Sequence, residues 1–378
     1  MSPLAWQIYA GVVGACVGSF LNVVIWRLPR GENLAKPRSR CPGCGQPIRW
    51  FDNVPVLSWL LLRARCRRCR TSISVRYPLV EALTAALFVL AAARTGLPDD
   101  AALFAVNAVF TSAMVAIAFI DLDTRLIPDV ISKPGIAVGL FASLLVPRMH
   151  DAGFLPEMTN RAVASLLEGA AGAATGAGVL LLVRWIGSLA FKKEAMGLGD
   201  VKLLAMIGAF TSPIGVLYVL LLASLSGAIV GVVFVAVRKR GFAALSGTVA
   251  KSATIRAGRV EGDALELVVH GVPPAKGDDV AIDLVIPADA AWFDGEPRLS
   301  LRGAVERVEP RGEGASRVRV ALASPNERAR DLLTTFAHAR LAVPFGPFLA
   351  AGGVAVRLYA EPIREFVTET WPRIVRGS

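Results

Sequence analysis

Residues 101–125 read AALFAVNAVFTSAMVAIAFIDLDTR, a run of twenty uncharged residues that ends on Asp121 and Asp123. A helix of about 20 apolar residues crosses the ~30 Å hydrocarbon core of a bilayer. Similar uncharged runs recur along the 378 residues, which are 54% hydrophobic and only 19% charged. This composition excludes a soluble enzyme, a disordered protein and a small secreted disulfide scaffold. The sequence therefore predicts an all-α polytopic membrane protein.

We expect about eight transmembrane helices, of which the sixth and seventh are separated only by Thr211-Ser212-Pro213. They lie near residues 3–26, 78–94, 101–120, 128–147, 164–190, 201–213, 214–237 and 343–360. The first run lacks the basic n-region and the cleavage site of a signal peptide, so we interpret it as a span. Cys16 within it is interpreted as a buried apolar residue.

The positive charge of the chain is concentrated in one loop. Of the net +11, residues 27–77 contribute 12 Lys/Arg against 2 Asp/Glu. A short basic loop between apolar spans is cytoplasmic under the positive-inside rule, and we prefer this interpretation to nucleic-acid binding. Both termini are then expected outside.

Five segments follow from these patterns: a first transmembrane helix (1–26), a cytoplasmic loop (27–77), a transmembrane bundle (78–240), an inserted cytoplasmic domain (241–340) and a last transmembrane helix with a C-terminal tail (341–378). The insert is hydrophilic, with 13 basic and 14 acidic residues. Short β-branched or alternating runs between Gly, Pro and Asp predict a small antiparallel sheet or barrel. The runs are Leu265–Val269, Val280–Ile286, Arg302–Val308 and Arg317–Ala321, and one helix is expected over Glu327–Arg340.

Four cysteines in the basic loop form two Cys-x-x-Cys pairs, Cys41 with Cys44 and Cys66 with Cys69. Two such knuckles provide the four thiolates of a structural Zn²⁺ site. Disulfides are disfavoured because thiols stay reduced in the cytoplasm, and an iron–sulfur centre is the less favoured metal alternative. A closed site of this kind would fold a loop too short to form its own core.

Acidic residues cluster where two predicted spans meet the cytoplasmic face. The third span runs into Asp121, Asp123 and Asp129, and the sixth opens with Gly197-Leu198-Gly199-Asp200. Carboxylates at a membrane span are costly and by default indicate function. Taken alone, Asp121 could equally be a solvated helix end, and the glycines before Asp200 could be a tight turn. Because both clusters are expected at the cytoplasmic face, they can meet across the helix bundle, and together they are harder to explain as local structure.

Two neighbouring carboxylates suit the chemistry of an aspartic protease. Because both cannot ionise together, they share one proton. One carboxylate then acts as base on a water molecule while the other donates to the substrate carbonyl. The glycines before Asp200 would let the backbone bend and admit a peptide strand. The three histidines lie outside these clusters.

These motifs resemble those of the bacterial type IV prepilin peptidases (prepilin leader peptidase/N-methyltransferases), which are GxGD-type intramembrane aspartic proteases. The resemblance covers about residues 1–240 and 341–360. Its motifs occur in family order: Gly18–Val24, Arg27–Pro29, the two Cys-x-x-Cys pairs, Arg76–Glu81, Ile120–Asp123, Leu126–Asp129, Gly197–Leu204 and Pro344–Ala350.

The resemblance implies that Asp121 and Asp200 are catalytic, with Asp123, Asp129, Gly197, Gly199, Lys202 and Glu81 in supporting roles. Glu81 and Lys202 could equally be ion-pair partners. The implied enzyme sits in the bacterial inner membrane, in contact with membrane lipid, with its active site on the cytoplasmic side. It cuts the leader of type IV prepilins and type II secretion pseudopilins after a Gly. It then N-methylates the new N-terminus with S-adenosylmethionine as methyl donor, although no Gly-rich nucleotide turn is present.

The insert departs from the family pattern. Its strands resemble PilZ-type barrels, but the Arg-x-x-x-Arg and Asp/Asn-x-Ser-x-x-Gly elements of those barrels are not recognisable, so we expect a spacer or protein-contact role. Three other functions compete with the bifunctional enzyme: a peptidase without methyltransferase activity, a non-catalytic membrane sensor, and a proton-coupled transporter. The transporter is disfavoured because Asp121 and Asp200 lie at a membrane edge and not near its middle.

Overall fold

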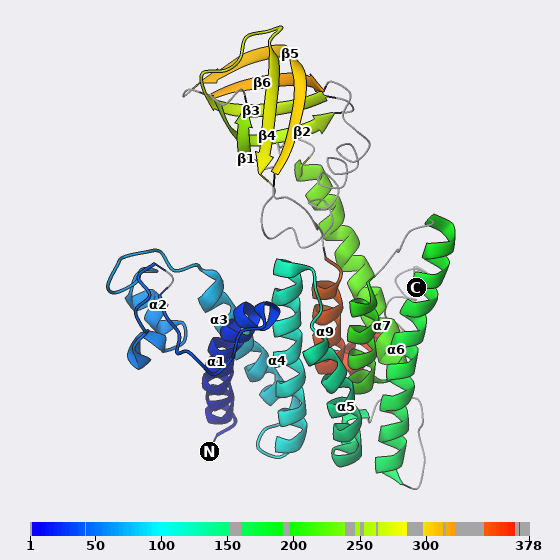
Figure 1. The fold of residues 1–378 in the computed structure, drawn as a ribbon. Helices are drawn as coiled ribbons and strands as arrows, with labels where there is room; N and C mark the ends of the chain where they lie inside the picture. Colours follow the sequence, from blue (N-terminus) through cyan, green and yellow to red (C-terminus); the bar gives the residue numbers. More distant parts are fainter. Residues whose placement is uncertain are drawn as a thin grey trace. The chain divides into compact units, whose positions relative to one another are not determined.

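The computed structural model describes residues 2–41, 43–150, 160–191, 197–238, 246–249, 253–261, 264–285, 298–312, 315–322, 344–366 and 370 (Figure 1). The chain divides into two compact units. One comprises Met1–Gly227 with Pro344–Ser378, and the other comprises Ala228–Val343.

The first unit is helical. Its elements are α1 (Pro3–Arg27), η1 (Leu28–Arg30), η2 (Trp50–Asn53), α2 (Leu57–Leu61), α3 (Arg76–Thr95), α4 (Ala101–Thr124), α5 (Asp129–Leu145), η3 (Pro147–His150), α6 (Arg161–Phe191), α7 (Leu198–Arg238) as far as Gly227, and α9 (Gly346–Glu365). Five described segments are long and apolar enough to cross a membrane: Pro3–Arg30, Arg76–Thr95, Ala101–Thr124, Arg161–Ala190 and Leu198–Val233. The chain is thus a multi-pass membrane protein, but the predicted count of eight spans is not confirmed.

The predicted sixth and seventh spans form one element, α7, with a bend inside it. Ser212 has a left-handed φ of 78°, and Pro213 follows it. Proline offers no backbone N–H and cannot continue the hydrogen-bond ladder. The carbonyl groups of the preceding turn therefore lose their partners within the helix.

The helices of this unit approach one another closely through small residues. Any Cβ atom on Gly172 of α6 would collide with the Gly208 carbonyl of α7, and a Cβ on Gly18 of α1 would lie 2.7 Å from Glu81 Cα of α3. Apolar burial drives little helix association in lipid, so such close backbone packing takes its place. The prediction that Cys16 is buried is wrong, because it is exposed on α1; the apolar pattern of a span does not indicate which face meets another helix.

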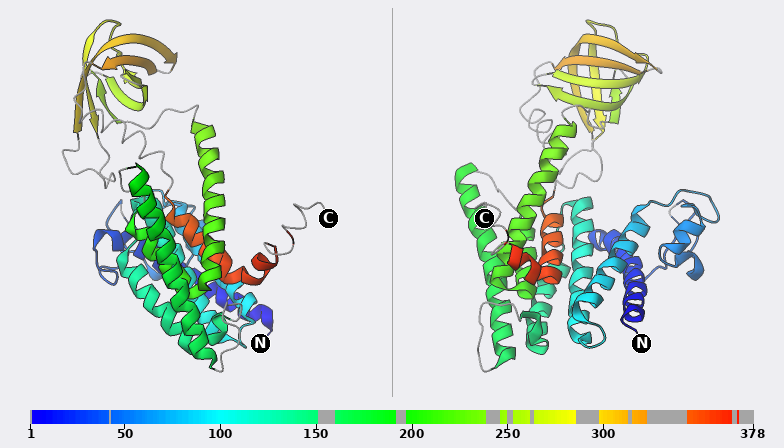
Figure 2. Two further views of the ribbon diagram at one scale, coloured as in Figure 1. Left: turned by 90° about the vertical axis from the view of Figure 1, so that its right-hand side faces the viewer. Right: turned by 180° about the vertical axis from the view of Figure 1, so that it is seen from behind.

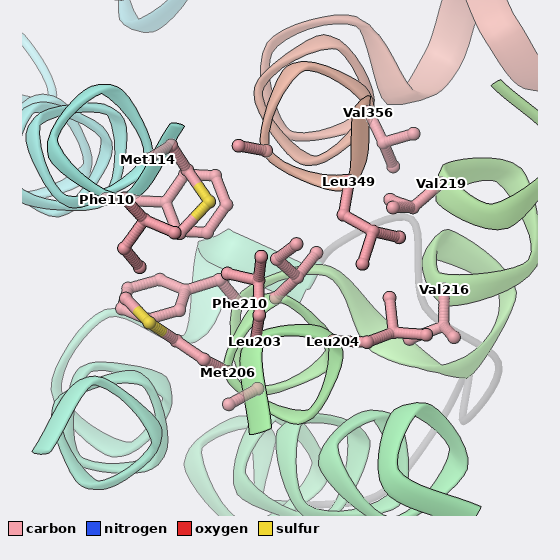
Figure 3. Packing of buried hydrophobic residues seen from close by; sticks show 14 of the residues in the cluster. Phe110, Met114, Leu203, Leu204, Met206, Phe210, Val216, Val219, Leu349 and Val356 are labelled. Carbon is pink, nitrogen blue, oxygen red and sulfur yellow. The ribbon is translucent and has the colours of Figure 1, made fainter. Parts of the chain in front are cut away.

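The core of the bundle lies where α4, α7 and α9 meet (Figure 3). Phe110 of α4 and Phe210 of α7 have ring centroids 4.9 Å apart. Leu349 of α9 is fully buried in the same cluster. These three helices also carry the residues of the site described below, so the core fixes their spacing.

The second unit contains a closed antiparallel barrel, visible in Figure 2, with strand order β1-β2-β3-β6-β5-β4. The strands are β1 (Ser246–Val249), β2 (Ala253–Glu261), β3 (Ala264–Gly271), β4 (Asp279–Val285), β5 (Arg298–Gly312) and β6 (Ala315–Leu322). The four predicted strand runs are confirmed within β3 to β6, except for Ile286, which lies outside the described residues, and β1 and β2 were missed. The helix expected over Glu327–Arg340 lies outside the described residues.

Candidate active site and metal centre

Asp121 lies in the last turn of α4, and its side chain is buried, with 4% of the residue exposed. The helix ends at Thr124 and is capped by Arg125, whose backbone is left-handed (φ 56°) and whose N–H donates to the Asp121 carbonyl at 2.9 Å. This termination leaves the Asp121 carboxylate at the end of a span, where the chain turns away toward α5.

Asp200 lies in the first turn of α7, two residues after the helix begins at Leu198. The N-terminus of a helix carries partial positive charge and unpaired N–H groups, which favour a carboxylate there. Asp200 is close enough to Asp121 for the two carboxylates to interact electrostatically. The fold therefore brings together the two acids from separate motifs.

A third segment, the start of α9, completes this arrangement. The backbone N–H of Gly346 donates to the Asp121 carboxylate. A Cβ atom on Gly346 would collide with that carboxylate and would lie 3.4 Å from Ile127 Cδ1. A Cβ on Gly199 would lie 3.0 Å from Ile127 Cβ, so Ile127 separates the two glycines. Gly346 was not among the predicted site residues, although its Pro-Phe-Gly-Pro motif was a signal in the sequence.

Asp123 points away from the pair. It is exposed and forms a 2.6 Å ion pair with Arg76, the first residue of α3. Arg76 also donates to the Phe119 carbonyl at 3.2 Å and lies over the Phe119 ring. The ion pair therefore joins the start of α3 to the end of α4.

Asp129 and Lys202 meet as an ion pair beside Asp200. Lys202 Nζ lies 2.6 Å from Asp129 Oδ1, and Lys133 Nζ lies 2.7 Å from Asp129 Oδ2. Lys202 is in the turn of α7 that follows Asp200, and Asp129 opens α5. The contact joins the beginnings of these two helices.

Two other predicted residues lie in different surroundings. Glu81 is buried on α3, where it accepts a 2.7 Å hydrogen bond from the Val56 N–H and bonds to Ser19. It therefore ties the cysteine loop to α1 and α3. Gly197 is exposed just before α7, and a Cβ there would meet no other part of the chain closer than 3.9 Å.

The four predicted metal ligands converge. One ligand atom from each of Cys41, Cys44, Cys66 and Cys69 lies within 4.8 Å of all the others, and none is in a disulfide. Tetrahedral Zn–S bonds of ~2.3 Å imply sulfur atoms roughly 3.8 Å apart. The Sγ atoms of Cys41 and Cys69 are 3.6 Å apart, so the donor set fits a tetrahedral thiophilic ion.

The two halves of this centre share one backbone pattern. The N–H of the first cysteine donates to the carbonyl five residues on, from Cys41 to Gln46 at 2.9 Å and from Cys66 to Thr71 at 2.8 Å. The residue after the second cysteine is left-handed in both halves, Gly45 with φ 68° and Arg70 with φ 60°. Such a repeated turn orients two sulfurs toward one point.

The thiols of this centre differ: burial and hydrogen bonding to the Cys66 and Cys69 thiols raise the pKa of the Cys41 thiol to about 11, whereas Cys69 favours its ionised form. The Thr71 hydroxyl lies 3.2 Å from the Cys69 sulfur. Its hydrogen bond, with that of the Thr71 N–H, lowers the pKa of the Cys69 thiol to about 6. The thiolate is the form that ligates metal, so this shift favours metal binding at neutral pH.

Two models of protein families match the sequence of this chain. A sequence model of the bacterial peptidase A24 N-terminal domain matches residues 12–95, and one of the type IV leader peptidase family matches residues 108–232. The chain is 37% identical over 257 residues to the type 4 prepilin-like proteins leader peptide-processing enzyme of Escherichia coli, covering 63% of this chain and 88% of that protein. The chain belongs to the type IV leader peptidase family.

Two further family members bear the name prepilin leader peptidase/N-methyltransferase. The Myxococcus xanthus protein is 42% identical over 227 residues, covering 60% of this chain and 62% of its own length. The Neisseria gonorrhoeae protein is 35% identical over 267 residues, covering 64% of this chain and 87% of its own. The two family matches lie on either side of the α3–α4 connection and contain the cysteine motifs and the Asp121 and Asp200 motifs, respectively.

Proposed function

We propose that this protein is an aspartic endopeptidase that removes the leader of type IV prepilins and pseudopilins after a Gly, on the cytoplasmic side of the bacterial inner membrane. The observation that carries the proposal is that Gly346 packs against both the Asp121 carboxylate and Ile127, while Gly199, the residue before Asp200, packs against Ile127. This packing places the two acids near enough to interact electrostatically. A buried carboxylate such as Asp121, with a second, partly buried carboxylate near it, has no packing purpose that apolar side chains would not serve better.

In the proposed reaction the pair shares one proton. The ionised carboxylate removes a proton from water, and the water oxygen attacks the carbonyl carbon of the scissile peptide bond. The other carboxyl group donates its proton to the carbonyl oxygen. The C–N bond then breaks as a proton passes to the leaving amine, which becomes the new N-terminus of the pilin. The Gly346 N–H orients Asp121 by holding one of its oxygens.

The neighbouring residues would prepare this site. Gly197 and Gly199 leave the backbone open before Asp200, which allows an extended peptide to approach. The Lys202–Asp129 and Arg76–Asp123 ion pairs hold the helix ends that carry the two acids. Glu81, bonded to Val56, would connect the cysteine loop to the bundle.

The cysteine centre would hold a structural Zn²⁺ through Cys41, Cys44, Cys66 and Cys69. A bound Zn²⁺ would cross-link the loop, and its four coordination positions would all be filled by cysteines. The names of the relatives also support N-methylation of the new N-terminus from S-adenosylmethionine. For the inserted barrel we propose a spacer or protein-contact role, so its removal should preserve cleavage. The enzyme itself would support type IV pilus assembly or type II secretion.

The test uses detergent-purified protein, a prepilin and mass spectrometry of the released leader. We expect the wild type to cleave after Gly, and Asp121→Asn and Asp200→Asn to abolish cleavage. Asp99→Asn is the matched control, because Asp99 is an exposed acid in the α3–α4 connection. Added S-adenosylmethionine should increase the mass of the pilin by one methyl group.

Cleavage that survives either catalytic substitution would refute the pair and direct attention to Asp123 or Asp129. Cleavage without methylation would leave a peptidase only. A wild type that cleaves no prepilin would favour the sensor function.

A further inference from the structure

Arg357 is a cation on α9 that the proposed reaction does not use. Its Nη2 atom is buried from solvent and has no hydrogen-bond partner among the described residues. An arginine within a membrane bundle is costly, and such residues are retained where they have a function. Arg357 therefore needs an explanation beyond packing, and its other contacts supply one.

The guanidinium of Arg357 joins three other elements. Its Nε donates to Asn107 Oδ1 of α4 at 2.8 Å. Its Nη1 donates to the Met149 carbonyl of η3 at 2.7 Å and to the Phe210 carbonyl of α7 at 3.1 Å. A planar guanidinium can make these bonds at fixed angles, which a flexible ammonium cannot.

The Phe210 carbonyl is available because α7 bends immediately after it. Ser212 is not helical and Pro213 has no N–H, so the carbonyls before the bend are the unpaired end of a half-helix that begins at Leu198. A cationic side chain at the C-terminal end of a helix stabilises those carbonyls and the helix dipole. Arg357 thus caps the half-helix whose first turn carries Asp200.

The three helices joined by Arg357 are the three that form the candidate active site. Asn107 lies fourteen residues before Asp121 on α4, and Arg357 lies eleven residues after Gly346 on α9. At 1.5 Å per residue, these segments span roughly 16–21 Å. Phe210 lies ten residues after Asp200, about 15 Å along α7. One side chain therefore links the far ends of all three segments.

A neighbouring histidine, His150, adds no second positive charge beside Arg357. His150 on η3 is buried and bonds to Ser165 at 3.0 Å. Burial, aided by the positive charge of Arg357, lowers the pKa of His150 to about 3. The ring is therefore neutral at physiological pH.

We propose that Arg357 is a positioning residue for the peptidase: it fixes the axial register of α4, α7 and α9 and so holds Asp200 and the Gly346 N–H against Asp121. The inference rests on the proposed function, because the reaction it would support is the one proposed for Asp121 and Asp200. Arg357 itself touches no reacting atom. Loss of the clamp would let α9 slide or rotate relative to α4 without unfolding the core.

The kinetic test compares Arg357→Met and Arg357→Lys with the wild type in the prepilin assay. We expect kcat to fall by roughly 10- to 100-fold in Arg357→Met, because small misplacements of catalytic groups cost that much, while KM stays within about threefold. Arg357→Lys should recover part of kcat, since it keeps the positive charge but not the planar set of guanidinium donors. Arg94→Gln is the matched control: Arg94 is exposed and also contacts α9, through the Tyr359 ring at 4.0 Å.

A second measurement does not depend on activity. Hydrogen exchange of the protein in lipid nanodiscs should become faster in the first turn of α9 in Arg357→Met and stay unchanged in α1 and α3. Unchanged exchange in α9, or a wild-type kcat in Arg357→Met, would overturn the inference. A loss of kcat equal to that of Arg94→Gln would also overturn it. If the wild type cleaves no prepilin, the proposed function fails, and the exchange data still decide whether Arg357 clamps α9.

Discussion

The substitution Gly346→Ala tests the candidate active site at its tightest backbone contact. The added Cβ would lie 3.0 Å from Asp121 Cγ and closer still to Oδ2. Carbon atoms prefer separations of about 3.5 Å or more, so the carboxylate or α9 must move by at least roughly 0.5 Å. That displacement reaches the tolerance of about 0.5 Å within which catalytic groups must be held. We therefore expect kcat to fall by roughly 10- to 100-fold.

The assay is steady-state cleavage of a prepilin in detergent, with kcat and KM measured separately. Gly346 does not have a left-handed φ, so alanine should leave the fold intact and KM little changed. Gly178→Ala is the matched control, because a Cβ on Gly178 of α6 meets open space. A wild-type kcat in Gly346→Ala would refute the contact between α9 and Asp121 as a determinant of activity. A comparison of the melting temperatures of Gly346→Ala and Gly178→Ala shows whether the substitution at Gly346 destabilises the fold.

Three further outcomes are expected. Cys44→Ser should lower the zinc content measured by plasma mass spectrometry. Cys16→Ser, which replaces an exposed cysteine of α1, should retain the zinc. A full zinc content in Cys44→Ser would exclude the four-thiolate centre. Lys202→Asp should reduce cleavage, and combining it with Asp129→Lys should restore part of the loss if their 2.6 Å ion pair positions α7; the stability change of this half-exposed pair should be at most about 1 kcal/mol. Burial lowers the pKa of His150 from 6.5 to about 3. Below pH 6.5 the unfolded chain therefore binds a proton at His150 that the folded chain does not bind. The free energy of unfolding should then be highest above pH 6.5 and should decrease as the pH falls toward 3. His150→Gln should flatten that decline in melting temperature, and an unchanged slope would contradict the buried neutral ring.

Much of the candidate site could be predicted from local patterns. Cys-x-x-Cys pairs bring two sulfurs together within one turn, so the metal centre needed only the approach of two such turns. Asp121 and Asp200 stood out because an acid next to an apolar span is rare. Arg357 in the last predicted span was not among the predicted site residues, and no local pattern indicates its partners.

Other features could not be predicted because they depend on distant contacts. The Asp123 partner, Arg76, is 47 residues away, and Asn107 bonds to a residue 250 positions later. Strands β1 and β2 were missed because Ser246–Val249 is short and rich in small residues and β2 carries polar ones; both are held by pairing within the closed barrel. The exposure of Cys16 depends on which side of α1 meets α3, and hydropathy carries no information about direction when every face is apolar.

The amino-acid sequence by itself determined the apolar helices, the cysteine knuckles, the chemistry of the acidic motifs and the family. These properties depend on residue types within one or two turns, and short-range sterics, hydrophobicity and ligand spacing act over that range. The tertiary structure alone decided that Gly346 donates to Asp121, that Ile127 separates two glycines, and that Arg357 caps the half-helix of Asp200. Those contacts join α4, α7, α9 and the α4–α5 connection, which are far apart in the sequence. Their geometry follows from packing at close range, where a shift of half an ångström determines whether a hydrogen bond forms.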